Sequence, residues 1–416
     1  MHRDDSQRDQ VSSQYCEDDE VRVVWDKNLK DKRVVGLENR KNFCFANATM
    51  QCLASTPMVG NLAITSPLPQ TVESTSSYAK FEALICKLRP KASSLDAYVQ
   101  RKFVDDWVNV YQFAVPVKYQ ADAPEFLEGF LRHLTDLEYD AQLQLGKPHD
   151  FKQETLRTER AFRYYQTTSK ICTTCHRQEL LEEESVSSKR PLTVYRSEDS
   201  KKRKRDTSIM DFLTDTWLSK RETKCKTCKT RTEYDEIRFL FPPNNLILNI
   251  DVEDTTVTLE KTLDIQRFVD ASGNHQYELH GIVVYNKCGD GGHYIAHVQN
   301  MKNEWYTTND PTSTLTDWDA IKTRKPLPSW CENDRQQGSH LLFYHRTSPN
   351  LDAFPQKPPT PSTLQTKEGK RRVGLLRLRQ KLQRGEVGSL HTSPLTEDQK
   401  NRLRNRLRHL HRAPPQ

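Results

Sequence analysis

One cysteine near the start of the chain stands between two phenylalanines, in the stretch GLENRKNFCFANATMQCL that runs from Gly36 to Leu53. Apolar residues recur with helical spacing after Cys44, so we expect a helix to begin at about this cysteine. Two interpretations follow. Cys44 is either one more small residue of a buried helix, because free cysteine is among the most buried residue types, or a thiolate at the positive end of that helix.

A histidine and an asparagine that could serve such a thiolate lie far downstream, in CGDGGHYIAHVQNMKNEWYTTND. Glycines precede a predicted strand that opens at His293, and a second predicted strand, EWYTT, runs into Asn309 and Asp310. A short connection between these strands would place Asn309 beside His293, where the amide oxygen can accept the Nδ1 proton and fix the tautomer. With Cys44, these residues would supply the nucleophile, base and orienting group that a cysteine protease needs.

Four of the ten cysteines form two C-x-x-C pairs, CTTC and CKTC. The short turn within each pair lets both sulfur atoms face one ion, and the two pairs together offer the four soft ligands of a tetrahedral zinc site. The set contains no histidine and implies no open ligand position. We therefore expect one structural zinc ion and no catalytic cofactor, although a chance pairing of cysteines is the alternative. The predicted ligands are Cys172, Cys175, Cys225 and Cys228.

The composition is typical of an intracellular protein that is only partly folded. Charged residues make up 29% of the 416 residues, and the mean hydropathy is -0.83. The charged first ten residues do not resemble a secretory signal, and no apolar run has the length needed to span a bilayer. Ten cysteines are too few for a disulfide scaffold in a chain of this length. We expect a reducing location, the nucleus or the cytoplasm, and no membrane partner.

Changes in composition divide the chain into four parts. Residues 1–34 carry many charges and few apolar anchors, which predicts a flexible arm, and residues 35–346 are apolar enough to fold. Residues 347–366 form a Pro-rich linker, and residues 367–416 form a basic tail that we expect to be disordered. The tail holds 14 Lys and Arg against 4 Asp and Glu, which exceeds the net charge of +7 of the whole chain. The folded region is therefore close to neutral.

Helical and strand patterns succeed one another along the folded region. Helical spacing of apolar residues appears after Cys44, in SYAKFEALICKL and most clearly in DAPEFLEGFLRHL. The second half contains short β-branched and aromatic runs bounded by Gly, Asn and Asp, namely NLILNI, YELHGIVVY, HYIAHV and HLLFYH. Helices first and strands later predict an α+β fold.

Taken together, these segments resemble the ubiquitin-specific protease family of deubiquitinases. The family's first box, G-L-x-N-x-G-N-T-C-Y-M-N-S-x-L-Q, is matched at Gly36, Leu37, Asn39, Asn42, Cys44, Asn47 and Gln51. Its middle block, Q-Q-D-A-x-E-F-L, is matched at Gln120, Asp122, Ala123, Glu125, Phe126 and Leu127. Its histidine box and closing L-F-Y-x-R are matched at Gly292, His293, Tyr294, Trp305, Asn309, Asp310, Leu342, Phe343, Tyr344 and Arg346.

The resemblance implies a role for each site residue. Cys44 would be the nucleophile, and His293 the general base and then the general acid. Asn309 would orient the histidine, with Asp310 as a second candidate for that role. Asn39 falls where the family has a side-chain oxyanion donor, which stabilises the negative charge of the tetrahedral intermediate.

The resemblance also implies the architecture and the reaction. The expected fold is papain-like, with a helical thumb that holds Cys44, a β-rich palm that holds His293 and Asn309, and zinc-tied fingers at about 165–240. The expected partners are ubiquitin and ubiquitinated proteins. The expected activity is hydrolysis of the isopeptide or peptide bond after the C-terminal glycine of ubiquitin, through an acyl-enzyme thioester.

Several positions depart from the family pattern. Lys41 replaces a glycine, Phe43 a threonine, Phe45 and Ala46 a Tyr-Met pair, and Ala121 a glutamine. None of these changes removes a reacting group, but a lysine at position 41 resists backbone angles that a glycine there can adopt. Two other classes of protein stay open. The departures around Cys44 favour a catalytically impaired ubiquitin-binding scaffold, and the basic tail with the cysteine pairs suggests a zinc-containing protein that binds nucleic acid.

The basic segments suggest further partners. KKRKR at 201–205 is a candidate nuclear localisation patch or a solvated loop, and the tail favours nuclear targeting or binding to an acidic partner such as nucleic acid. LRLR at 376–379 also matches the end of ubiquitin before its two glycines, which would make the tail a pseudo-substrate. Gln380 and Lys381 stand in place of those glycines, which argues against this autoinhibition.

Overall fold

A computed structural model of the protein describes residues 33–39, 42–60, 77–90, 98–99, 122–144, 157–172, 174–175, 178–182, 191–195, 207–221, 224–230, 233–252, 256–269, 274–288, 291–324 and 339–348. The chain divides into two compact units, 1–358 and 359–416, and all described residues belong to the first. The predicted arm before residue 33, most of the Pro-rich linker, the basic tail, the KKRKR patch and positions 41 and 121 lie outside the described residues. Among the described helices, none combines the length and the apolar composition that crossing a membrane requires.

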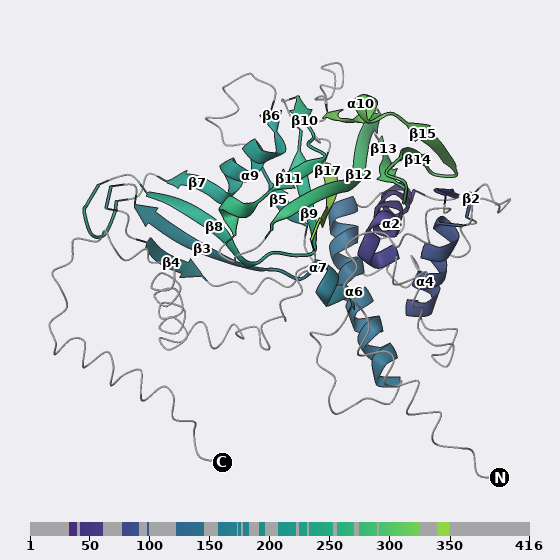
Figure 1. The fold of residues 1–416 in the computed structure, drawn as a ribbon, viewed down its shortest axis with the longest axis horizontal. Helices are drawn as coiled ribbons and strands as arrows, with labels where there is room; N and C mark the ends of the chain where they lie inside the picture. Colours follow the sequence, from purple (N-terminus) through teal and green to yellow (C-terminus); the bar gives the residue numbers. More distant parts are fainter. Residues whose placement is uncertain are drawn as a thin grey trace, which may run out of the picture. The chain divides into compact units, whose positions relative to one another are not determined.

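An eight-stranded sheet forms the centre of the described fold (Figure 1). Its strands follow the order β15-β14-β13-β12-β17-β9-β5, and β11 also pairs with β12. Neighbours are antiparallel apart from β5, which runs parallel to β9. The strands are β5 (Leu192–Val194), β9 (Asn245–Asp251), β11 (Thr262–Asp264), β12 (Gln276–Cys288), β13 (Gly291–Gln299), β14 (Trp305–Asn309), β15 (Thr312–Thr316) and β17 (Ser339–Arg346).

Both faces of this sheet are covered. Along β12, Val283 faces one apolar cluster while its neighbours Ile282 and Val284 face another, because successive side chains of a strand point to opposite faces. Along β17, Phe343 and Leu342 divide between the same two clusters. This double burial explains why these strands are nearly continuous apolar runs in the sequence.

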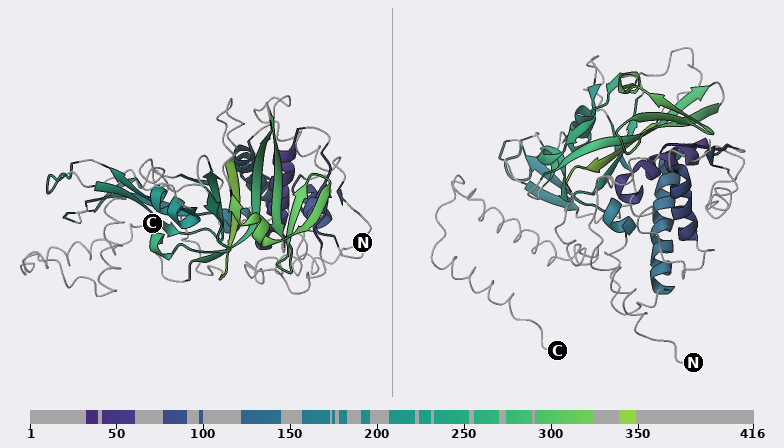
Figure 2. Two further views of the ribbon diagram at one scale, coloured as in Figure 1. Left: turned by 90° about the horizontal axis from the view of Figure 1, so that it is seen from above. Right: turned by 45° about the vertical axis from the view of Figure 1, so that its right-hand side comes forward.

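Helices α2, α4, α6 and α7 pack on one face of the sheet, and α9, α10 and η3 contribute to the cluster on the other. Figure 2 shows α2, α4 and α6 grouped beside the sheet in both further views. The helices are α2 (Cys44–Ser55), α4 (Ser77–Leu88), α6 (Ala123–Gln144), α7 (Arg157–Phe162), α9 (Ile209–Trp217), η3 (Gln266–Phe268) and α10 (Trp318–Ile321). Helices at the predicted segments are confirmed, and α9 adds a helix among the later strands.

Helix α2 is enclosed by the protein, and all twelve of its residues are buried. It packs against β12, β13, α4 and α6. Its polar side chains find partners inside the protein, as burial requires. Gln51 donates to the carbonyl of Val35 at 2.7 Å and accepts from the guanidinium of Arg89 at 2.9 Å. The position of this helix is therefore set by core packing and by buried hydrogen bonds together.

A second sheet of four strands, the fingers, consists of two adjacent hairpins in the order β4-β3-β8-β7. Three further strands form the small sheet β16-β10-β6, and β1 pairs with β2 in parallel. The finger strands are β3 (Tyr165–Cys172), β4 (Gln178–Glu182), β7 (Leu218–Arg221) and β8 (Glu233–Phe241). The small strands are β1 (Gly36–Leu37), β2 (Tyr98–Val99), β6 (Thr207–Ser208), β10 (Val257–Thr258) and β16 (Thr323–Arg324). The mixed α+β fold predicted from the sequence is confirmed.

Candidate active site

The nucleophile candidate is the first residue of helix α2, as predicted. Cys44 is buried, with 3% of its surface exposed. Phe43 occupies the N-cap position and offers no side-chain cap to the helix. The main-chain N–H of Phe43 instead donates to Oδ1 of Asn39, over 3.4 Å. The sulfur thus lies at the helix end where aligned peptide dipoles favour a negative charge.

The structure brings His293 and Asn309 together, but through the other ring nitrogen. Nε2 of His293 lies 2.7 Å from Oδ1 of Asn309, so the bond expected at Nδ1 is wrong. Strands β13 and β14 are antiparallel with Ala296 opposite Thr308, and Asn309 therefore lies about two residues along β13 from His293. From that position, the side-chain oxygen of Asn309 meets Nε2 of the ring. An amide oxygen only accepts hydrogen bonds, so Nε2 carries a proton and donates in this contact, and in the Nε2–H tautomer Nδ1 is an acceptor.

Asp310 connects several segments around the site. Its Oδ1 accepts from Nδ2 of Asn47 at 2.8 Å, and its Oδ2 accepts from Nδ2 of Asn39 at 3.0 Å. Its carbonyl oxygen accepts from the main-chain N–H of Leu37 at 2.7 Å. The carboxylate is 3.7 Å from Nε2 of His293, beyond a good hydrogen bond. Of the two candidates for the orienting role, Asn309 contacts the ring more closely, and Asp310 joins the β14–β15 turn to the chain around the cysteine.

The side chain of Asn39 is fixed at both ends. Its oxygen accepts from Phe43, and its nitrogen donates to Asp310. An amide NH2 group has two protons, of which Asp310 accepts one. This orientation holds Asn39 beside the start of α2, next to the residue that precedes the nucleophile.

Asn47 is a site residue that the sequence indicates only as a match to the family box. It lies three residues after Cys44, it is 3% exposed, and its Nδ2 is 3.2 Å from the carbonyl oxygen of Leu37 and 3.3 Å from that of Glu38. The same nitrogen donates to Asp310. Spacing of three residues puts side chains on one side of a helix, and that signal could have pointed to Asn47.

Two glycines allow the close contacts on which the site depends. A Cβ atom at Gly36 would overlap the carbonyl oxygen of Pro311, where β1 lies against the turn after β14. A Cβ atom at Gly292, the neighbour of His293, would overlap the ring of Tyr285. Gly36 therefore needs a residue without a side chain, because main-chain atoms fill the space, whereas a side chain at Gly292 would force the ring of Tyr285 to move.

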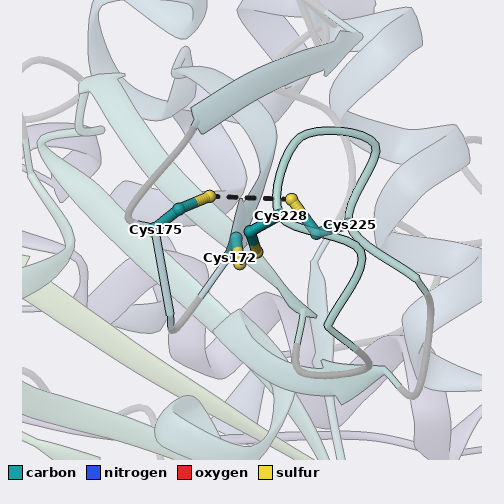
Figure 3. A group of neighbouring side chains, drawn as sticks. All are labelled: Cys172, Cys175, Cys225 and Cys228. Atoms are coloured by element: carbon teal, nitrogen blue, oxygen red, sulfur yellow. Dashed lines mark hydrogen bonds between the residues drawn. The ribbon is translucent and has the colours of Figure 1, made fainter.

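The four predicted metal ligands meet where the two finger hairpins turn (Figure 3). Cys172 ends β3 and Cys175 follows it before β4, whereas Cys225 and Cys228 lie between β7 and β8. Because β3 and β8 are antiparallel neighbours, both turns lie at the same end of the sheet. The expected grouping of the four cysteines is confirmed.

The sulfur atoms have the spacing of a tetrahedral metal site. All four lie within 4.8 Å of one another, with 3.5 Å between Cys172 and Cys228 and 3.7 Å between Cys175 and Cys225. Four thiolates at about 2.3 Å from one zinc ion would be about 3.8 Å apart. A disulfide would need about 2.05 Å, and none of these four cysteines forms one. The donor set therefore fits zinc.

Hydrogen bonds favour the thiolate form that a metal requires. The main-chain N–H of Cys175 is the main cause that lowers the pKa of Cys172, to about 6. The hydroxyl of Thr230, 2.9 Å from the sulfur of Cys228, is the main cause that lowers the pKa of Cys228. These hydrogen bonds thus favour the thiolate forms of two of the four ligands, Cys172 and Cys228.

The arrangement of these elements defines a papain-like thiol protease fold, with a helical thumb, a β-rich palm and fingers. The SAGA Ubp8/Sgf11/Sus1/Sgf73 DUB module bound to ubiquitin aldehyde superposes with a TM-score of 0.56 at 17% identity, over 84% of this chain and 77% of that chain. The Ubp8 module bound to monoubiquitin gives a TM-score of 0.55 at 17% identity, with the same coverage.

The family model named ubiquitin carboxyl-terminal hydrolase matches residues 35–344. This protein belongs to that family, and the family recognised from the motifs is confirmed. Ubiquitin carboxyl-terminal hydrolase 16 of Arabidopsis thaliana is 25% identical over 348 residues, 76% of this chain and 30% of the relative. Ubiquitin carboxyl-terminal hydrolase 25 of the same plant is 22% identical over 359 residues, 80% of this chain and 50% of the relative. The chain thus corresponds to half or less of the length of these relatives.

Proposed function

We propose that this protein is a deubiquitinase that hydrolyses the isopeptide or peptide bond after the C-terminal glycine of ubiquitin. Family membership supports this reaction class, and the Ubp8 modules bind ubiquitin or ubiquitin aldehyde. The observation that carries the proposal is the 2.7 Å contact between His293 and Asn309, on strands that pack against the helix that begins at Cys44. These three residues would form the catalytic triad.

The tautomer of His293 sets the direction of proton transfer. Because Nε2–H is engaged by Asn309, Nδ1 takes the proton of Cys44, and the thiolate attacks the carbonyl carbon of the terminal glycine. The intermediate collapses as His293 returns the proton to the departing amine, which leaves a thioester on the sulfur. Water then gives a proton to His293 and attacks the thioester. The carbon–sulfur bond breaks, His293 returns its proton to the sulfur of Cys44, and ubiquitin leaves as a carboxylic acid that loses its proton to water.

Asn39 would stabilise the oxyanion of both tetrahedral intermediates. Its amide already lies beside the start of α2, fixed by Phe43 and Asp310. A second proton of the NH2 group would point at the developing charge, where it acts without reorganisation. The main-chain N–H of Cys44 would be the natural companion donor.

The cysteine cluster would hold one structural zinc ion. Bound zinc would cross-link the two hairpin turns, because Cys172 and Cys175 come from one turn and Cys225 and Cys228 from the other. Ubiquitin would then rest between the fingers and the palm, with its C-terminus directed towards Cys44. The nuclear or cytoplasmic location and the acidic partner of the basic tail remain predictions from the sequence.

The alternative function, an impaired ubiquitin-binding scaffold, rests on the positions around Cys44 that depart from the family pattern. Two of these departures have a packing role: the rings of Phe43 and Phe45 meet edge to face at 6.0 Å, and Phe45 meets Phe126 of α6 at 5.4 Å. Both side chains are buried, so they point into the thumb. These two changes therefore alter the core beneath the nucleophile, and neither removes a reacting group.

A ubiquitin molecule with a thiol-reactive C-terminus tests the proposed function. We expect it to label the wild-type chain at Cys44 and to leave Cys44→Ala unlabelled. Cys86→Ser is the matched control, because Cys86 is a partly exposed thiol on α4 that should play no part in labelling. An unlabelled wild-type chain that still binds ubiquitin would establish the scaffold instead.

A further inference from the structure

Two buried amides of helix α2 bind different parts of the protein. Asn47 and Gln51 are 3% and 1% exposed, and both donate to main-chain carbonyls in the segment before the helix. Gln51 otherwise contacts Arg89, at the end of α4. Asn47 otherwise contacts Asp310, in the turn that follows β14. The two amides therefore resemble each other in burial and in local bonding, but of the two only Asn47 forms a hydrogen bond with the turn that follows β14.

The contact between Asn47 and Asp310 completes a short path from the nucleophile to the base. Cys44 and Asn47 are three residues apart on one helix, a rise of about 4.5 Å. From Asn47, the path passes through the 2.8 Å bond to Asp310, along one peptide unit to Asn309, and through the 2.7 Å bond to His293. Each step is either a covalent unit or one hydrogen bond.

Hydrogen bonds around Asp310 also make this path rigid. A hydrogen bond to a carboxylate is stronger than one between neutral groups, and its donor here is buried. Asp310 is held from three sides, because it also accepts from Asn39 and from the main chain at Leu37. Its φ angle of 49° is left-handed, a conformation that aspartate tolerates better than most residues do. The turn therefore has little freedom to move relative to α2.

We propose that Asn47 is a positioning residue that acts through Asp310 to fix the distance between Cys44 and the His293–Asn309 pair. The proposal deepens the proposed function and rests on it. The competing explanation is structural: Asn47 secures only the chain at Leu37 and Glu38, to which it also donates. The two explanations differ in what a substitution does to the chemistry of Cys44.

Asn47→Ala should lower kcat by about 10- to 100-fold, because a displacement of about 1 Å between reacting groups costs about that much. KM for a fluorogenic ubiquitin substrate should stay nearly unchanged, since ubiquitin does not contact this buried side chain. The rate at which iodoacetamide alkylates Cys44 at neutral pH should also fall, because the sulfur no longer shares its proton with His293. Alkylation needs no ubiquitin, so this readout stands even if the proposed substrate is wrong.

Gln51→Ala is the matched control. It removes a buried amide from the same helix, together with bonds to Val35 and Arg89, and it should cost at least as much stability in urea denaturation. We expect it to leave kcat and the alkylation rate close to wild type. Equal losses of kcat in both variants at equal stability would overturn the proposal, as would unchanged alkylation of Cys44 in Asn47→Ala.

Two further variants keep the proposal testable if Asn47→Ala does not fold. Asn47→Ser keeps a small polar side chain at this position but withdraws the donor from Asp310, and it should show the same loss of kcat. Asp310→Gly removes the carboxylate and suits the left-handed backbone. If Asn47 acts through Asp310, combining Asn47→Ser with Asp310→Gly should lower kcat little further than Asp310→Gly alone. Fully additive losses would contradict the proposal.

Discussion

The cysteine cluster of the fingers and the active site of the palm and thumb are both assembled from distant parts of the chain, but in different ways. The cluster joins two local pairs, each within four residues, that adjacent hairpins bring to one end of a sheet. The active site depends on single side-chain bonds across 263 and 271 residues, from Asp310 to Asn47 and to Asn39. Each cysteine pair can be recognised in the sequence from its own spacing, whereas a single long-range hydrogen bond can be identified only once the fold is known.

The largest effect should come from the contact that orients the base. Asn309→Ala removes the acceptor of Nε2–H, so the ring of His293 can instead carry its proton on Nδ1 and no longer accept one from Cys44. We expect kcat/KM to fall by about 10² to 10⁴. Asp310→Asn suits the left-handed backbone but replaces one acceptor oxygen by an NH2 group, so it can accept from Asn47 or from Asn39 but not from both, and we expect a loss of about 10-fold. Hydrolysis of a fluorogenic ubiquitin substrate measures both.

Reversal of that ranking would make Asp310 the orienting residue, although it lies 3.7 Å from the ring in this structure. His293→Ala is the upper reference for both variants, since it removes the base itself. A loss in Asn309→Ala that matches His293→Ala would show that the ring has no function without its partner.

An intermediate effect should come from the loss of one cysteine ligand in the fingers, and it should leave the reactivity of Cys44 unchanged. Cys225→Ser removes one buried ligand of the cluster, so bound zinc should fall from about one per chain and the finger hairpins should become sensitive to protease. KM for the ubiquitin substrate should rise several-fold. Alkylation of Cys44 by iodoacetamide should match wild type, because the palm and thumb keep their own hydrogen bonds.

Metal analysis of protein purified without chelator or acid is the direct measurement. Thr227→Ala is a suitable control, because it changes the same loop and leaves all four sulfur atoms. Zinc absent from the wild type, or retained in full by Cys225→Ser, would be incompatible with a four-cysteine site.

The smallest effect concerns two buried histidines of the palm. Nδ1 of His280 lies 3.2 Å from Nδ1 of His345, and Nε2 of His280 lies 3.0 Å from Oγ1 of Thr56, after the end of α2. The carboxylate of Glu278 is 3.8 Å from the other nitrogen of His345. Burial lowers the pKa of His345 to about 4, and burial, with His345 beside it, holds the pKa of His280 well below its usual value.

Both rings are therefore neutral in the folded protein, whereas the unfolded chain takes up protons below about pH 6.5. Stability is fully present above that pH and falls as the pH drops towards 4, by at most about 1.4 kcal/mol per pH unit for each ring. Urea denaturation at about pH 7 and about pH 5.5 measures the change. His345→Gln should show a shallower dependence on pH than the wild type, and an unaltered slope would contradict this origin.

Zinc release should be recorded in the same experiments, because cysteine ligands also bind protons as the pH falls. A loss of palm stability that precedes zinc release would show that the two regions respond to acid independently. Simultaneous loss would mean that they unfold as one unit.

Sequence patterns predicted the parts of the molecule that depend on short-range spacing. These include the helix that begins at Cys44, the apolar strands that end near Asn309, and the cysteine pairs. They misassigned the nitrogen of His293 that meets Asn309, because this depends on the offset of two residues between β13 and β14 and on the rotation of the ring. They gave Asn47 no role, because its partner in the turn after β14 is identified only by the packing of α2 on the sheet.

The long-range bonds of Asp310 also have a consequence in time. A chain is synthesised from its N-terminus at about 5 to 20 residues per second, and Asp310 follows Asn39 by 271 residues. The segment that carries Cys44 therefore leaves the ribosome tens of seconds before the strands with His293 and Asn309 do. During that interval the cysteine has no base and no fixed partner turn. A growing chain of this protein should remain without hydrolytic activity until the β14–β15 turn emerges and closes onto the segment around Leu37.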